Sequence, residues 1–171
     1  MKTDTPQTVY LKDYTPPAFW IDRVDLDFVI AAGRTTVSAT LSMRRNAARP
    51  GQPLVLDGEE LETISVCVDG LRWDPARYRQ SESQLIIENV PDAFMLETRV
   101  RLRPDSNTQL SGFYRSKDGY FTQCEPQGFR RITWFIDRPD VMARYTVTLH
   151  ADKAAFPFLL ANGNPVASGD E

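Results

Sequence analysis

The chain has 171 residues, of which 42% are hydrophobic and 25% are charged, a balance typical of one globular domain. Its net charge of −3 argues against general binding to nucleic acid or to acidic membranes. Residues 1–14 lack the apolar core of a secretory signal, and no run approaches the roughly 18 apolar residues of a membrane span. We therefore expect a cytoplasmic protein with no nucleic-acid and no membrane partner, in which Cys67 and Cys124 stay reduced.

The first part of the chain predicts an arm and a hairpin. Residues 1–20 are polar and then rich in proline and aromatic residues, which indicates an extended arm leading into a strand. Apolar and polar residues alternate over residues 24–30 and again over residues 35–43, on either side of a turn at residues 32–34. A period of two is typical of half-buried strands, so these runs are predicted to pair as a β-hairpin.

Further short strands are predicted between turn signals, while residues 73–83 are predicted to be irregular. An apolar run at residues 132–136 precedes Asp137 and Pro139, which together predict one short helical turn over residues 137–140. Helical periodicity is almost absent, so we predict an all-β fold, an antiparallel β-sandwich or a related open antiparallel architecture. The further strands are expected at residues 54–56, 64–68, 85–87, 94–102, 110–115, 120–123 and 145–149.

The stretch from Tyr120 to Asp140 holds the candidate binding residues. In a strand, Phe121, Gln123 and Glu125 would share one face. An amide and a carboxylate at a strand end can hold a cationic group, with Glu125 as the anion and Gln123 as a neutral donor and acceptor. The alternative interpretation is that both are ordinary solvated side chains.

The same stretch belongs to a set of motifs that extends over essentially the whole chain. By these motifs the chain resembles the N-terminal domain of the bacterial aminopeptidase N family of zinc metalloexopeptidases. The resemblance implies a saddle-like β domain that covers a catalytic domain of the same chain and contributes to its substrate pocket. The motifs are Thr122 to Glu125, Gly128 to Arg130, Ile132-Thr133, Asp137 to Val141, Lys12 to Tyr14, and parts of residues 25–28, 55–58, 112–114 and 151–164.

The resemblance also implies roles for individual residues. Gln123 and Glu125 match the Thr-Gln-x-Glu motif of the family, in which the glutamate binds the free α-amino group of a peptide and the glutamine lines the pocket for the first side chain. The implied partners are a peptide with a free N-terminus and the catalytic domain, and the implied cofactor is zinc in the full-length enzyme. Residues 1–171 are then expected to be one N-terminal domain that stops before its last strands. Trp134 departs from the proline that is frequent in the wider family, but an aromatic residue there resembles the bacterial members.

The catalytic motifs of such an enzyme do not occur in this sequence. It contains neither His-Glu-x-x-His nor Gly-x-Met-Glu-Asn, and its one histidine, His150, cannot supply a zinc site or a nucleophile–base pair. Glycine-rich phosphate motifs are also missing. We expect no catalytic residue, no metal ligand and no bound cofactor within these residues, so that the fragment alone is inactive.

Supporting roles are expected for the residues that follow the candidate site. Asp137 and Pro139 are expected to fix the turn behind it, and Arg130 to orient Glu125 or a nearby acid. The pairs Arg44-Arg45 and Arg130-Arg131 are expected to be solvated or paired with acids. A different function remains open at this point, because a free-standing, non-catalytic β-sandwich that binds peptides or sugars would show the same strand pattern.

Overall fold

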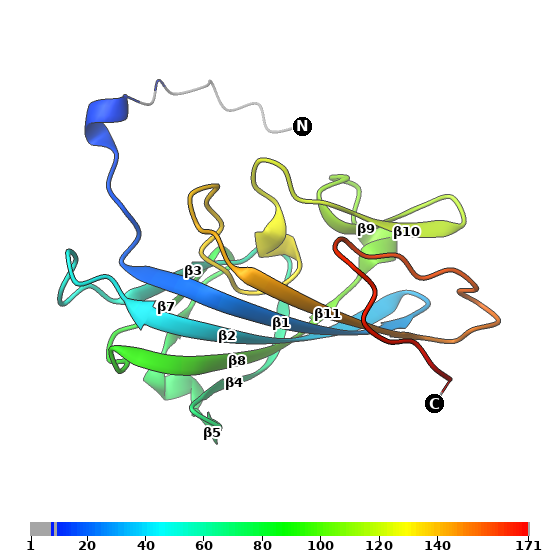
Figure 1. Cartoon of the computed structure of the whole chain (residues 1–171), viewed down its shortest axis with the longest axis horizontal. Coiled ribbons are helices and arrows are strands. Elements are labelled where there is room, and N and C mark those ends of the chain that lie inside the picture. Colours follow the sequence, from blue (N-terminus) through cyan, green and yellow to red (C-terminus); the bar gives the residue numbers. More distant parts are fainter. Residues whose placement is uncertain (1–7, 9, 171) are drawn as a thin grey trace.

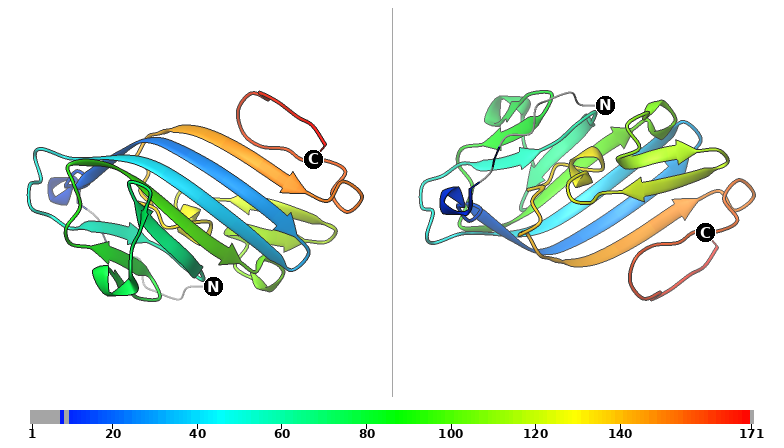
Figure 2. Two further views of the ribbon diagram at one scale, coloured as in Figure 1. Left: turned by 90° about the horizontal axis from the view of Figure 1, so that it is seen from below. Right: turned by 90° about the horizontal axis from the view of Figure 1, so that it is seen from above.

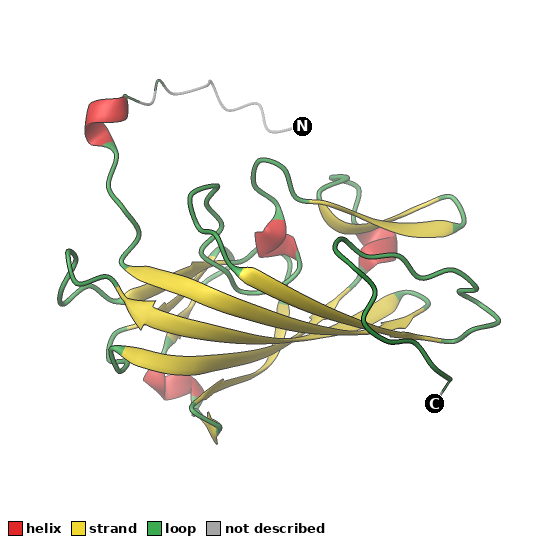
Figure 3. Ribbon diagram, viewed as in Figure 1, coloured by secondary structure: helices red, strands yellow, loops and turns green. Residues whose placement is uncertain are grey.

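The computed structural model describes residue 8 and residues 10–170, and these are arranged mainly as strands joined by loops and four short 3-10 turns (Figure 3). The predicted all-β class is confirmed. The strands are β1 (Phe19–Ala31), β2 (Arg34–Arg45), β3 (Leu54–Asp57), β4 (Glu62–Val68), β5 (Leu71–Arg72), β6 (Arg79–Gln80), β7 (Gln84–Ile87), β8 (Ala93–Leu102), β9 (Gly112–Ser116), β10 (Gly119–Gln123) and β11 (Arg144–Ala151). The 3-10 turns are η1 (Leu11–Asp13), η2 (Pro75–Arg77), η3 (Pro104–Ser106) and η4 (Phe129–Arg131).

A six-stranded sheet in the order β11-β1-β2-β8-β4-β5 forms the frame of the molecule (Figure 1). The predicted hairpin is its centre, with Phe28 of β1 opposite Val37 of β2. Alternate residues of the three central strands are buried on one face, which is where the core forms. The buried residues of these strands are Phe19, Ile21, Val24, Leu26, Phe28, Thr35, Val37, Ala39, Leu41, Met43, Phe94, Leu96, Thr98, Val100 and Leu102.

One edge of this sheet departs from the predicted antiparallel architecture. β11 pairs with β1 in parallel, from Arg23 opposite Arg144 to Ile30 opposite Ala151. A parallel pair requires the chain to cross over between its strands, and residues 32–143 make that connection. Alternation along residues 145–149 is the same for parallel and antiparallel neighbours, so it gave no sign of the direction.

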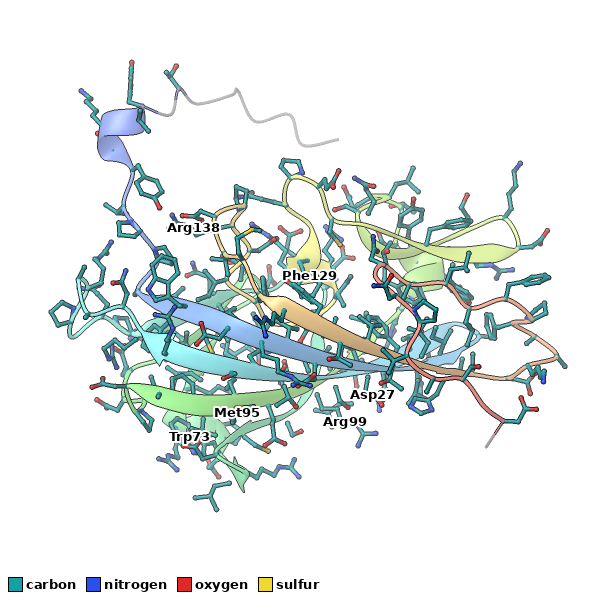
Figure 4. All side chains as sticks on the ribbon, viewed as in Figure 1. Asp27, Trp73, Met95, Arg99, Phe129 and Arg138 are labelled. Atoms are coloured by element: carbon teal, nitrogen blue, oxygen red, sulfur yellow. The ribbon has the colours of Figure 1, made fainter. Side chains whose placement is uncertain are left out.

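Three smaller units contribute buried residues to the same core as the large sheet. They are the sheet β3-β7-β6, the hairpin β9–β10 and the loop between β10 and β11. Seen from above in Figure 2, the hairpin and the loop lie across one face of the large sheet. In Figure 4, Phe129 and Arg138 of this loop lie on the opposite side of the large sheet from Met95 and Arg99. The loop therefore lies on the face of the large sheet opposite to Met95 and Arg99 (Figure 4).

Two local predictions need correction. Residues 73–83 are not wholly irregular, because they contain η2 and β6. The short helical turn lies at Phe129–Arg131 and not at residues 137–140. The reason is that the Asp137 carboxylate accepts hydrogen bonds from the earlier turn instead of capping its own.

The N-terminal arm is attached to the loop that follows Asp137. The Tyr14 hydroxyl donates to Asp140 Oδ2 at 3.0 Å, and Arg138 Nη2 donates to the Thr15 carbonyl at 2.9 Å. Arg138 also pairs with Asp140 at 2.6 Å. Residues 1–7 and 9 of the predicted arm lie outside the described residues. Within the described part, no helix is long and apolar enough to cross a bilayer.

Candidate functional site

The candidate site is the turn at the end of β10, where Gln123 and Glu125 are both exposed. β10 ends at Gln123, so strand alternation does not extend to Glu125. The two residues are connected by a hydrogen bond and not by a shared strand face: Gln123 Nε2 donates to the Glu125 backbone carbonyl at 3.5 Å. The Glu125–Pro126 peptide bond in the turn is cis. Within the described residues no ion pair engages the Glu125 carboxylate, which leaves it open to solvent as a hydrogen-bond acceptor.

Gly128 brings the turn back onto the end of β10. A Cβ at this position would lie 3.0 Å from both the Gln123 carbonyl oxygen and the Cys124 Cα, and 2.9 Å from Ser111 Oγ. Real Cβ atoms rarely approach backbone so closely, so the fold of the turn depends on a residue without a side chain here. Immediately after it, the Phe129 ring packs edge-on against Phe135, with centroids 4.6 Å apart.

The Asp137 carboxylate holds the turn from behind. Asp137 is only 5% exposed, and its Oδ2 accepts from the backbone N–H of Gly128 at 3.0 Å and of Arg130 at 3.3 Å. The Arg130 Nε donates to the same oxygen at 2.6 Å, and its Nη2 donates to the Asp137 carbonyl at 3.2 Å. Hydrogen bonds to an ionised acceptor are about twice as strong as neutral ones. The expected structural role of Asp137 and the pairing of Arg130 with a nearby acid are confirmed.

The end of β3 and the residues directly after it anchor Asp137 and its neighbours. Asp57 and Phe135 exchange two backbone hydrogen bonds, of 2.7 and 3.1 Å, and the Asp137 N–H donates to Asp57 Oδ2 at 3.2 Å. The Glu59 N–H donates to the Arg130 carbonyl at 2.9 Å. Burial raises the pKa of Asp57, while the nearby Arg130 opposes that rise. The turn of the candidate site is thus fixed to the smaller sheet through an acid–base cluster.

The other arginines of the two predicted pairs also meet acids. Arg44 lies 2.9 Å from Asp22 and Arg45 lies 2.8 Å from Asp92. Arg131 contacts Glu59 at 2.8 Å and Glu60 at 3.0 Å. These contacts confirm the prediction that the basic residues are paired with acids.

Cys124 lies half-buried between the two candidate residues. Burial, followed by the nearby charges of Asp137 and Glu125, raises the pKa of its thiol from 9.0 to about 11. The thiolate is the nucleophilic form, and two pKa units reduce its fraction at neutral pH by about 100-fold. Cys124 is therefore a poor nucleophile.

We expect alkylation of Cys124 to be slow and to keep accelerating at alkaline pH. In a Cys67→Ser background, the rate with iodoacetamide should rise about tenfold per pH unit up to pH ~10, because the thiolate fraction rises in that way below the pKa. A small thiol with a pKa near 9 serves as the reference, and its rate levels off earlier. A plateau for Cys124 near pH 9 would contradict the raised pKa.

The groups exposed at this turn are hydrogen-bonding groups. An exposed carboxylate can accept several hydrogen bonds, including those of an ammonium group. Among residue 8 and residues 10–170, no group of three or more His, Cys, Asp or Glu side chains is placed to hold a metal ion. The residues present therefore do not fit a zinc ion, and no hydrolytic step can be assigned to them.

Sequence reasoning missed the contribution of residues 57–59 to the site. Nothing in the local pattern around Asp57 and Gly58 related them to a loop more than 70 residues later. Only the need to satisfy the buried backbone N–H groups around Phe135 and Asp137 gave a general reason to expect such a partner.

Comparison with known proteins identifies the family to which the chain belongs. The sequence profile described as the peptidase M1 N-terminal domain matches residues 21–171, so the chain belongs to that family. The predicted resemblance is confirmed. The chain is 49% identical over 169 residues to Aminopeptidase N of Caulobacter vibrioides and 42% identical over 168 residues to Aminopeptidase N of Escherichia coli. These alignments cover 99% and 98% of this chain but 19% of each relative, so the chain spans about a fifth of their length.

Solved structures agree with this assignment. Legionella pneumophila aminopeptidase A, determined in complex with aspartic acid, superposes with a TM-score of 0.83 at 30% identity, over 90% of this chain and 18% of its own. The M1 zinc metallopeptidase of Deinococcus radiodurans superposes with a TM-score of 0.63 at 17% identity, over 80% of this chain and 33% of its own, which shows a shared fold alone.

Proposed function

We propose that residues 1–171 act as one domain that forms a wall of the substrate pocket in a zinc aminopeptidase. In this proposal Glu125 binds the free α-amino group of a peptide, and Gln123 contacts the first side chain. The observation that supports it is the exposed Glu125 side chain on a turn held in place from behind, with the Gln123 amide hydrogen-bonded to the Glu125 backbone carbonyl. A fixed anion facing an ammonium group favours peptides with a free N-terminus over those without one.

The catalytic chemistry is assigned to residues outside this chain. The relatives are about five times longer, and the names of the structural neighbours include zinc metallopeptidases. Zinc supplies Lewis-acid activation of water in such enzymes. The described residues offer no ligand set for it, so this chain contributes binding and orientation only. A cytoplasmic location is part of the proposal, supported by the free thiols of Cys67 and Cys124.

The substitution Glu125→Gln in the full-length protein tests the role of the carboxylate. We expect kcat/KM for aminoacyl p-nitroanilides to fall about 5-fold to 150-fold, which corresponds to a lost charge-assisted contact of about 1–3 kcal/mol. Glu82→Gln is the matched control, because Glu82 is also exposed but lies between β6 and β7. Equal kinetics for both variants and the wild type would remove Glu125 from the site.

A free-standing binding module is the other candidate, and the mass of the native polypeptide distinguishes the two. A species several times heavier than 19.4 kDa supports the pocket-forming domain. The same extract should then show zinc-dependent release of N-terminal residues that a chelator abolishes. A native product of the size of this chain would support the module.

A further inference from the structure

We infer that Asp137 is a positioning residue for the amino-group site: it sets where the Glu125 carboxylate stands, without touching the substrate. The inference rests on the proposed function of Glu125 and extends it to the residues behind the turn. It starts from the exposure of Glu125, because an exposed side chain on a turn has a defined position only if its backbone is held.

The turn that carries Glu125 is held at Gly128, where it returns to the end of β10. Gly128 follows Glu125 by three residues, and it lies so close to the end of β10 that a Cβ at its position would be 3.0 Å from the Gln123 carbonyl oxygen and from the Cys124 Cα. Its backbone N–H donates to Asp137 Oδ2 at 3.0 Å. A shift of Asp137 therefore moves Gly128, and a movement of Gly128 toward the end of β10 displaces the backbone at Gln123 and Cys124, just before Glu125.

Asp137 is suited to this role because its own position is fixed on two sides. Its N–H donates to Asp57 Oδ2 at 3.2 Å, at the end of β3, while Arg130 Nε donates to its carboxylate at 2.6 Å. Asp57 also exchanges backbone hydrogen bonds with Phe135. Supports of this kind, on regular elements behind a binding group, are what gives a binding group a precise position.

Small displacements of the Glu125 carboxylate have large consequences for binding. Charge-assisted hydrogen bonds between nitrogen and oxygen are formed at about 2.7–2.9 Å, and a misplacement of about 1 Å can cost up to 100-fold in rate. Loss of the Asp137 charge should thus weaken substrate binding through Glu125. A role in folding alone would instead reduce the amount of active enzyme and leave KM unchanged.

A double-mutant cycle in the full-length protein tests the inference. The variants are Asp137→Asn, Glu125→Gln and the double variant, assayed with aminoacyl p-nitroanilides. We expect Asp137→Asn to raise KM on the order of tenfold. In the Glu125→Gln background the same change should alter kcat/KM by less than about twofold, because the group that it positions is already lost.

Two results would overturn the positioning role. They are an unchanged KM in Asp137→Asn, whether or not kcat falls, and a double variant whose loss equals the product of the single losses. Glu125→Gln that behaves as the wild type would instead reject the proposed function itself, and the inference with it.

A second variant covers the case in which Asp137→Asn does not fold. Gly128→Ala keeps every charge and displaces the same turn through the contacts of its Cβ with Gln123 and Cys124. It should raise KM and should also show no further effect in the Glu125→Gln background. Additive losses in this cycle would reject the inference equally.

Discussion

Gly58→Ala is expected to destabilise the protein by about 3 kcal/mol, because it forces a methyl group into a filled part of the core. The Cβ of an alanine would lie 2.2 Å from Cζ3 and 2.3 Å from Cε3 of the Trp134 ring. Trp134 is 1% exposed and its Nε1 donates to Thr63 Oγ1 at 2.9 Å, so the ring cannot move aside without losing packing and a hydrogen bond. The Gly58 backbone is equally restrained, since its N–H donates to the Ser83 carbonyl at 3.0 Å.

The measurement is urea-induced unfolding followed by tryptophan fluorescence, with Gly169→Ala as the matched control. Nothing lies within 4 Å of a Cβ built on Gly169, and neither glycine has a positive φ. The control should therefore stay within about 0.5 kcal/mol of the wild type. Two variants with equal midpoints would mean that Trp134 does not pack on Gly58 as the structure has it.

Strand positions could be predicted from this sequence better than strand partners. The β1–β2 hairpin was predictable because its alternation is strong and its turn contains Gly33, which has a positive φ. The partner of β11 was not, because Tyr145 and its neighbours alternate in the same way beside either a parallel or an antiparallel strand. Direction was decided instead by the path of the chain between β1 and β11.

The candidate site shows the same division between local and distant information. Gln123, Glu125, Arg130 and Asp137 lie within one stretch, so their types and order could suggest a site and its support. The partner of that stretch is Asp57, which lies 80 residues away from Asp137 in the sequence. The only general reason to expect such a partner is that buried N–H groups require hydrogen-bond acceptors. The roles proposed for Gln123 and Glu125 remain predictions.

Arg130→Met is expected to cost about 2–4 kcal/mol at neutral pH, because it leaves the buried Asp137 carboxylate without its positive partner. The expected loss of stability is smaller than for a fully buried ion pair because the Arg130 side chain is 23% exposed. Arg79→Met is the matched control, since Arg79 and Glu88 form a pair with side chains 72% and 54% exposed. An exposed pair of this kind contributes about 1 kcal/mol or less.

The pH dependence of the Arg130→Met loss identifies its electrostatic origin. Burial already raises the pKa of Asp57 and Arg130 opposes that rise, so removal of Arg130 should raise this pKa further. An acid with a raised pKa in the folded state favours folding while it is protonated, and this contribution is lost as the pH rises through the interval above its ordinary value of 3.8. The deficit of Arg130→Met in urea unfolding should therefore be smallest near pH 4 and grow toward pH 7. A deficit that is the same at both pH values would assign the loss to side-chain packing, and would contradict the cluster of charges that fixes the turn.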